Sequence, residues 1–172
     1  KDGAGCVNGY MHLGIINHCE AYGSAKSTEG DYVGGISGEA RARIRQCFSL
    51  CTLSGDKYVG GIAGYATNLR DSYAMSDVSF ESGRGGAIAG QVGTKEDDYV
   101  MADHIIGNYY VGDDLAGIDN ISYTGIAEPI TYETLLSVAN LPLDYRHLTV
   151  YYMVDGECVD SQEVPYGESL SD

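Results

Sequence analysis

Apolar and polar residues in the first two thirds of the chain follow a short motif that recurs at a fixed spacing. The stretch YVGGISG at residues 32–38 returns as YVGGIAG at 58–64 and, in altered form, as RGGAIAG at 84–90. The central isoleucines of the three copies are each 26 residues apart. A constant period over three copies predicts a repeat array in which every unit adopts the same structure.

A second apolar segment lies between successive copies of this motif. Residues 16–21 (INHCEA) align with 44–49 (IRQCFS), then with 69–74 (LRDSYA) and 106–111 (IGNYYV). Each unit therefore holds two short apolar segments separated by polar turn residues. Their β-branched and aromatic side chains favour strands, and their short length and frequent glycines are unsuited to helices.

Isolated units of this size cannot fold, and this predicts how they assemble. Each buried side chain contributes about 1.5–3 kcal/mol, whereas ordering the backbone costs about 1–2 kcal/mol per residue. Stacked units share backbone hydrogen bonds and one core. We therefore predict an all-β fold, a right-handed parallel β-solenoid of about four coils with a 26-residue period. The expected buried columns are Ile36, Ile62 and Ile88, and then Ile16, Ile44, Leu69 and Ile106.

Glycines beside the first column allow the strand to bend and neighbouring backbones to approach. The predicted structural repeat residues are Gly34, Gly35, Ile36, Gly38, Gly60, Gly61, Ile62, Gly64, Gly86, Ile88 and Gly90. Because these clusters recur evenly and match no phosphate-binding motif, we interpret them as structural.

Two different elements follow the array. Residues 129–140 predict a short helix with Thr131 as N-cap, placed to cap the last coil. Residues 148–164 predict a β-hairpin around Asp155-Gly156. The expected domains are 1–112 (solenoid repeats), 113–142 (cap segment with the short helix) and 143–172 (hairpin, the start of a following stalk module).

Charge is concentrated after the array. Residues 1–95 carry nine acidic and nine basic side chains, whereas residues 96–172 carry sixteen acidic side chains and only Arg146, which gives the net charge of −15. An acidic surface repels phosphate backbones, so nucleic acid is excluded as a partner. No run approaches the roughly 18 apolar residues of a membrane span, so no membrane insertion is expected in this segment.

Candidate chemistry is sparse, and we expect no catalytic residue, cofactor or metal. The four histidines are scattered without H-E-x-x-H spacing, and Ser37 is replaced by alanine in the next two repeats. The acidic groups Glu96-Asp97-Asp98 and Asp113-Asp114 are interpreted as solvated loops, with calcium binding as the alternative. Arg41, Arg43, Arg45 and Arg70 are expected to pair with nearby acids rather than to form a basic stripe.

Cysteines and tyrosines leave two further alternatives. Cys19 and Cys47 occupy equivalent positions in adjacent coils, at a spacing of about 4.8 Å that a disulfide could bridge. Free stacked thiols are favoured because Ser72 takes that position in the next coil. The candidate ligand surface, suited to stacking sugars, consists of Tyr109, Tyr110, Tyr151 and Tyr152.

The repeat resembles the GLUG motif of bacterial surface proteins over residues 14–112. The resemblance lies in the Gly-Gly-Ile-(Ser/Ala)-Gly core, the Tyr-Val before it and the Ile-x-polar-Cys-(Phe/Tyr) segment after it. The asparagine that the family places before the cysteine is His18, Gln46 and Asp71 here, and only Asn108 in the fourth unit matches. Residues 164–170 resemble the end of a strand in Listeria–Bacteroides-type β-grasp-like repeats.

The GLUG resemblance implies a secreted or wall-attached bacterial protein, such as an adhesin or the non-catalytic part of an IgA-specific metallopeptidase. We therefore expect a non-catalytic structural or adhesive segment, extracellular, with other modules of the same polypeptide and a host surface protein or glycan as partners. The alternatives are a carbohydrate-binding accessory domain and the non-catalytic region of a secreted protease.

Overall fold

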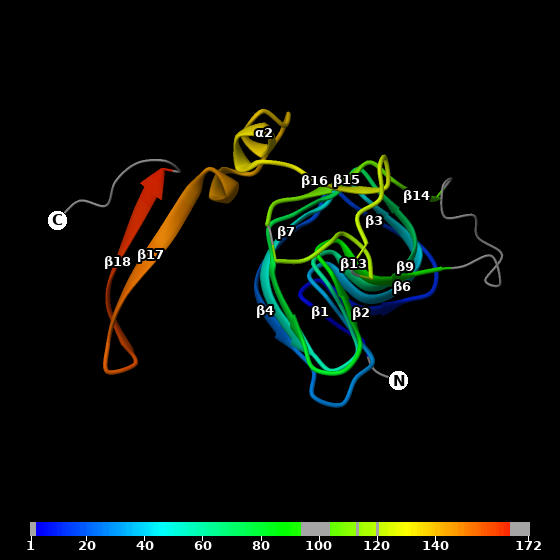
Figure 1. Ribbon diagram of the computed structural model, residues 1–172, viewed down its shortest axis with the longest axis horizontal. Coiled ribbons are helices and arrows are strands. Elements are labelled where there is room, and N and C mark those ends of the chain that lie inside the picture. The colour runs from blue at the N-terminus through cyan, green and yellow to red at the C-terminus, as the bar shows by residue number, and fades with distance from the viewer. Residues whose placement is uncertain (1–2, 94–103, 113, 120, 166–172) are drawn as a thin grey trace. The chain divides into compact units, whose positions relative to one another are not determined.

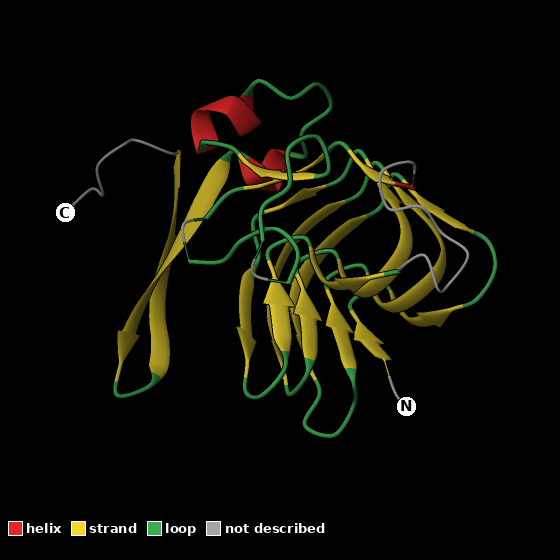
Figure 2. Cartoon of the chain, turned by 45° about the vertical axis from the view of Figure 1, so that its right-hand side comes forward, coloured by secondary structure: helices red, strands yellow, loops and turns green. Residues whose placement is uncertain are grey.

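Parallel strands from successive turns of the chain pair into three sheets, which confirms the predicted all-β solenoid. The computed structural model describes residues 3–93, 104–112, 114–119 and 121–165. The chain divides into two units, Lys1–Thr131 and Tyr132–Asp172, which are described separately. In Figure 1 the turns of the first unit overlie one another, and Figure 2 shows their strands side by side.

The first sheet contains the two Tyr-Val-Gly segments with one further strand on each side, and it has the predicted period. Its strands are β1 (Gly3–Gly5), β5 (Tyr32–Gly34), β8 (Tyr58–Gly60) and β12 (Arg84–Gly86). Tyr32 pairs in register with Tyr58, and Tyr58 with Arg84, so the 26-residue spacing corresponds to one turn.

Two longer sheets complete each turn. The second sheet consists of β2 (Asn8–Met11), β3 (Ile15–Asn17), β6 (Ser37–Arg45), β9 (Ala63–Arg70), β13 (Ala89–Val92) and β14 (Ile105–Ile106). The third consists of β4 (Glu20–Lys26), β7 (Phe48–Gly55), β10 (Tyr73–Ala74), β11 (Asp77–Phe80), β15 (Asn108–Tyr110) and β16 (Ala127–Pro129).

The solenoid has about three turns, whereas the sequence predicted about four coils. Three turns begin at β1, β5 and β8, and each passes through all three sheets. From β12 to β16 the described strands are only two to four residues long. The motif at residues 84–90 therefore begins a turn that the described residues complete only in short pieces.

The column of repeat isoleucines forms the centre of the core. Ile36, Ile62 and Ile88 are each 0% exposed. The backbone N–H of Ile36 donates to the carbonyl of Ile62, and that of Ile62 to Ile88, both at 2.8 Å. One side chain and one backbone hydrogen bond are thus repeated at the same place in consecutive turns, as stacking requires.

The second buried column differs from the prediction by one residue in the fourth unit. Ile44 pairs with Leu69, and Leu69 pairs with Ile105 rather than Ile106. Ile105 is 1% exposed and Ile106 is 41% exposed. Because side chains alternate between the faces of a strand, only one of two adjacent isoleucines can point inward.

Left-handed backbone at one corner explains this register. The residues between the second and third sheets have positive φ in every turn: His18 (52°), Gln46 (51°), Asp71 (52°) and Gly107 (69°). The N–H of Gln46 donates to Arg70 O, and that of Asp71 to Ile106 O. Gly107 rather than Asn108 is therefore the fourth corner residue, because the inserted residues before it shift the alignment by one.

Close backbone contact explains the Gly-Gly pairs of the repeat. A Cβ added to Gly60 would overlap the carbonyl oxygen of Ala63 and lie 2.5 Å from the Cα of Ala89. Only glycine allows the strand to turn into the next sheet while touching the following coil.

The last turn of the first unit is covered by the segment that follows β15. The N–H groups of Ile88 and Ala89 donate to Gly117 O at 2.9 and 3.1 Å, and β16 pairs with β15. Asn108, fully buried, donates through Nδ2 to Leu69 O and Ile126 O and accepts from the N–H of Ser72. Residues 116–119 and 121–130 therefore supply partners for backbone groups that would otherwise be unpaired at this end of the core.

The second unit contains the predicted helix and hairpin. The helix α2 (Tyr132–Leu136) is shorter than expected and is followed by the 3-10 turn η2 (Leu143–Tyr145). Strands β17 (His147–Val154) and β18 (Glu157–Pro165) form an antiparallel hairpin. Both Asp155 and Gly156 have positive φ, as a two-residue type I′ turn requires.

Candidate ligand groove

A groove of about 410 Å³ crosses the outer face of the second sheet and is built from four successive turns. Its lining residues are His12, Leu13, Gly14, Ile15, Arg41, Ala42, Arg43, Thr67, Asn68 and His104. Because the solenoid places equivalent segments next to one another, these residues come together although they are far apart in the chain.

The groove exists because successive turns bend with different numbers of residues. Met11, Ala40 and Ala66 are in register, and Ile15, Arg43 and Asn68 are in register further along. Three residues (12–14) separate the two positions in the first turn, two (41–42) in the second and one (67) in the third. The bend of the first turn is exposed, that of the second turn has exposed Arg41 and buried Ala42, and the short bend at Thr67 is buried. The floor of the groove is therefore formed by the shorter bend.

Two buried polar atoms in the floor lack a partner. Thr67 Oγ1 and Asn68 Oδ1 have no hydrogen bond within the described part of the chain, although their residues are only 2% and 9% exposed. Leaving such an atom unsatisfied costs about 1–3 kcal/mol. A bound molecule that presents hydroxyl groups would supply the donor that Asn68 Oδ1 needs and a partner for the Thr67 hydroxyl.

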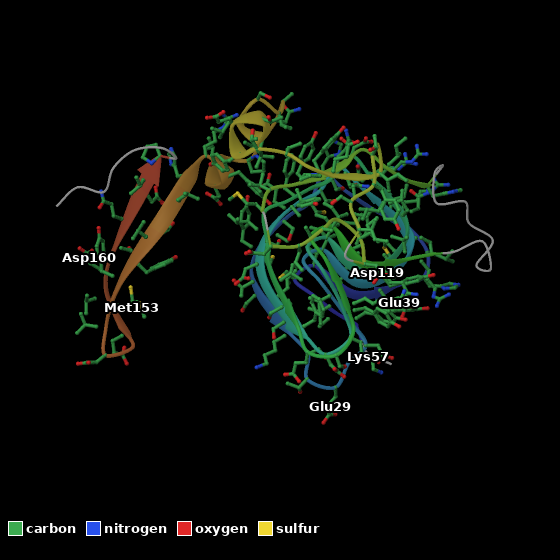
Figure 3. All side chains as sticks on the ribbon, in the orientation of Figure 1. Glu29, Glu39, Lys57, Asp119, Met153 and Asp160 are labelled. Atoms are coloured by element: carbon green, nitrogen blue, oxygen red, sulfur yellow. The ribbon has the colours of Figure 1, made fainter. Side chains whose placement is uncertain are left out.

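Positive charge lies beside this floor. Arg43 is exposed and is in register with Asn68. Arg41 Nε donates to Glu39 Oε1 at 2.7 Å, and its guanidinium lies 5.5 Å from the Tyr65 ring (Glu39 is labelled in Figure 3). The hydrogen bond to Glu39 raises the pKa of Arg41. Arg41 is thus paired with an acid, as expected for this arginine, and Arg43 is the side chain placed to meet an anionic group.

The tyrosines predicted to form a ligand surface have three different environments. Tyr109 stacks on Tyr73 with ring centroids 5.6 Å apart, in a ladder on the third sheet that continues to Phe48. Tyr110 is 3% exposed, and its hydroxyl hydrogen-bonds Ser122 Oγ at 2.6 Å. Burial of Tyr110 removes it from any ligand surface, because β alternation turns it inward when Tyr109 faces out.

Tyr151 and Tyr152 belong to the second unit. They lie on β17 and are 63% and 36% exposed. Whether Tyr151 and Tyr152 stack on sugars is therefore a separate question from whether Tyr109 does.

The cysteines are all free, and one close pair was not predicted. Cys19 and Cys47 occupy equivalent corner positions, as the sequence indicated, and burial raises the pKa of Cys47 to about 11. The unexpected pair is Cys6 and Cys51, whose Sγ atoms are 3.3 Å apart. Cys6 precedes the first aligned segment, so repeat alignment gives no signal for its partner.

No group of three or more His, Cys, Asp or Glu that could hold a metal ion occurs among the described residues. The acidic stretch Glu96-Asp97-Asp98 and Asp113 lie outside those residues, so the calcium alternative stays open there. Within the described ranges, no helix is long and apolar enough to cross a membrane.

Comparison with known proteins leaves the family unassigned. No family model matches the chain, and no curated protein or solved structure matches it significantly. The resemblance of residues 14–112 to GLUG repeats therefore remains a prediction that rests on the motif itself.

Proposed function

We propose that this chain is a non-catalytic structural or adhesive segment of an extracellular bacterial surface protein, which positions neighbouring modules of the same polypeptide. The observation that carries this proposal is the column of Ile36, Ile62 and Ile88, repeated with the same backbone hydrogen bonds in successive turns. Such a column makes consecutive turns one continuous core, which resists bending between them.

A structural role predicts that the shape of the array matters more than its surface. In the parent protein, residues 1–131 are replaced by an unrelated β-solenoid with the same number of turns, or by a flexible Gly/Ser linker of equal length. We expect the unrelated solenoid to keep adhesion of cells to their target surface and the flexible linker to reduce it. Loss of adhesion with both replacements would refute a purely structural role and place the contact surface in the array.

A carbohydrate-binding function is the second candidate, and the groove favours it. Its floor holds the unpartnered Asn68 Oδ1 and Thr67 Oγ1, and Arg43 lies beside them. Sugar hydroxyls are suitable partners for the floor, and a carboxylate or sulfate is suitable for the guanidinium. The ligand class proposed is therefore an acidic glycan.

Binding to a glycan array that includes uronic-acid and sulfated sugars tests this second candidate. Arg43→Glu should weaken binding roughly 10-fold or more, because a charge-assisted hydrogen bond is worth about 1.5–3 kcal/mol. Lys26→Glu is the matched charge reversal at an exposed position on the third sheet and should bind normally. An array without any bound glycan, or equal binding by both variants, would remove the sugar-binding function.

A further inference from the structure

Cys6 and Cys51 bring two thiols from different turns into contact. Their Sγ atoms are 3.3 Å apart, although the residues are separated by 45 positions in the sequence. Cys6 lies between β1 and β2 in the first turn, and Cys51 lies on β7 in the second. Cys51 is 3% exposed, whereas Cys6 is partly exposed and packs against the core.

We propose that Cys6 and Cys51 are a cross-linking site that closes to a disulfide when the folded protein meets a small-molecule disulfide. The sulfur atoms must approach from 3.3 Å to the disulfide bond length of about 2.0 Å, a closure of about 1.3 Å. Side-chain rotation at two cysteines supplies such a movement without a change of fold. The inference does not rest on the proposed function, because it concerns only the two thiols.

The reaction is a two-step thiol–disulfide exchange. The partly exposed Cys6 thiolate attacks one sulfur of the reagent, which forms a mixed disulfide on Cys6 and releases one small thiolate. The Cys51 thiolate then attacks the Cys6 sulfur, forms the Cys6–Cys51 bond and expels the second small thiolate. The two protein thiols lose two protons and two electrons, and one reagent disulfide is reduced to two thiols.

Burial of Cys51 controls the rate of the second step. Its buried position and the neighbouring Cys6 thiol raise the pKa of Cys51 to about 12. Only the thiolate is nucleophilic, so the mixed disulfide on Cys6 should persist at neutral pH and close faster in alkali. Well below the pKa, the thiolate fraction and the closure rate rise about tenfold for each pH unit.

The bond would fasten the first turn to the second. In the described part of the chain, β2 and β3 pair only with β6, and β4 pairs only with β7, so the first turn has a stacking partner on one side. A cross-link restricts the conformations open to the unfolded chain between residues 6 and 51 and thereby disfavours unfolding. The oxidised protein should consequently melt several degrees above the reduced protein.

The experiment isolates this pair within the full chain. Cys19→Ser, Cys47→Ser and Cys158→Ser remove the other thiols. Serine suits the corner positions because Ser72 occupies the same column and its hydroxyl donates to Arg70 O, just as Cys47 Sγ donates to Arg45 O. The folded triple variant is treated with hydroxyethyl disulfide at pH 7 and pH 9, and intact mass and melting temperature are recorded.

We expect a product that has lost two hydrogens, forms faster at pH 9 and melts higher until a reducing agent is added. Adding Cys51→Ser to the same background should leave only the mixed disulfide on Cys6, with no rise in melting temperature. A triple variant that retains both Cys6 and Cys51 but accumulates the Cys6 adduct without ever closing at pH 9 would overturn the proposal.

A second measurement covers the case in which the triple variant does not fold. The wild-type chain is oxidised and then cleaved at Met11 and Phe48, which separates Cys6 and Cys51 from each other and from the fragment that holds Cys19 and Cys47. A bond between the fragments that contain Cys6 and Cys51 supports the proposal. Cross-links only to Cys19, Cys47 or Cys158 would refute it.

Discussion

At the residue scale, the most regular feature is the left-handed corner between the second and third sheets. His18, Gln46, Asp71 and Gly107 share positive φ although their side chains have little in common. His18, Gln46 and Asp71 are exposed, so backbone conformation rather than packing selects them. Asparagine, aspartate, histidine and glycine tolerate this region, and β-branched residues do not.

Substitution of Gln46 tests the corner directly. Gln46→Val should lower the free energy of unfolding by about 1 kcal/mol, because a β-branched residue is strained at positive φ. Gln46→Asn should leave stability unchanged or raise it slightly. Urea unfolding of both variants provides the measurement, and equal midpoints would mean that the left-handed backbone is not what constrains this position.

Asn108 is the one fully buried side-chain amide in the described part of the chain, and it joins the third turn to the covering segment. Asn108→Ala should destabilise the protein by about 2–3 kcal/mol, since the N–H of Ser72 and the carbonyl of Leu69 lose their hydrogen bonds to this amide. Thermal unfolding measures the effect. Asn17→Ala, at an exposed position on β3, is the control and should shift the melting temperature by a degree or less.

The sequence predicted whether a side chain points inward only where the neighbouring residues determine its orientation. The isoleucines of the first column recur at a constant spacing in similar seven-residue motifs, so their inward position could be inferred from the motif. Ile105 and Ile106 lie after inserted residues, where either could continue the second column. The choice is made by Gly107, whose φ of 69° sets the corner one residue earlier than the alignment did.

At the scale of elements, the isoleucine column links strands that no single turn could hold. Ile62 is 0% exposed and lies between Ile36 and Ile88. Ile62→Asp should unfold the first unit, because an unpaired buried charge costs as much as about 5 kcal/mol, comparable to the whole stability of a domain. Arg43→Glu, at an exposed position on β6, should be nearly silent in stability.

Circular dichroism and thermal unfolding of the two variants check this expectation. A melting temperature for Ile62→Asp within a degree of wild type would contradict a dry column at this position. Ile62→Val is a more conservative substitution than Ile62→Asp. It should retain the fold and lower the free energy of unfolding by about 0.5–1.5 kcal/mol.

The sequence predicted those elements whose backbone conformation is determined by a few neighbouring residues. Asp155-Gly156 indicated the hairpin because both positions must adopt positive φ, as they do. The predicted helix was too long. The helix ends at Leu136, and the chain continues in turns to Asn140, whose φ is 61°. The groove was not predicted, because it arises from unequal bends in adjacent turns and not from any repeated motif.

At the scale of the whole molecule, turns that share the motif differ in how many neighbouring turns they pair with. β9 lies between β6 on one side and β13 and β14 on the other. In the described part of the chain, β2 and β3 lie at the edge of the same sheet. Equivalent side chains show a small difference in burial: Ile16 of the first turn is 8% exposed, whereas Ile44 and Leu69 of the next two turns are 0% exposed.

A nearest-neighbour solenoid should therefore open from the first turn while its middle remains closed. Amide hydrogens of β9 that donate to neighbouring turns should exchange only on global unfolding, whereas those of β2 and β3 should exchange through local opening with a smaller free energy. Native-state hydrogen exchange at increasing denaturant separates the two cases.

Closing the Cys6–Cys51 bond should bring the protection of β2 and β3 closer to that of β9, because the first turn then cannot leave the second without breaking a covalent link. Equal protection of all three strands in the reduced protein would mean that the turns unfold as one cooperative block, and stability would then not be a sum over neighbouring turns.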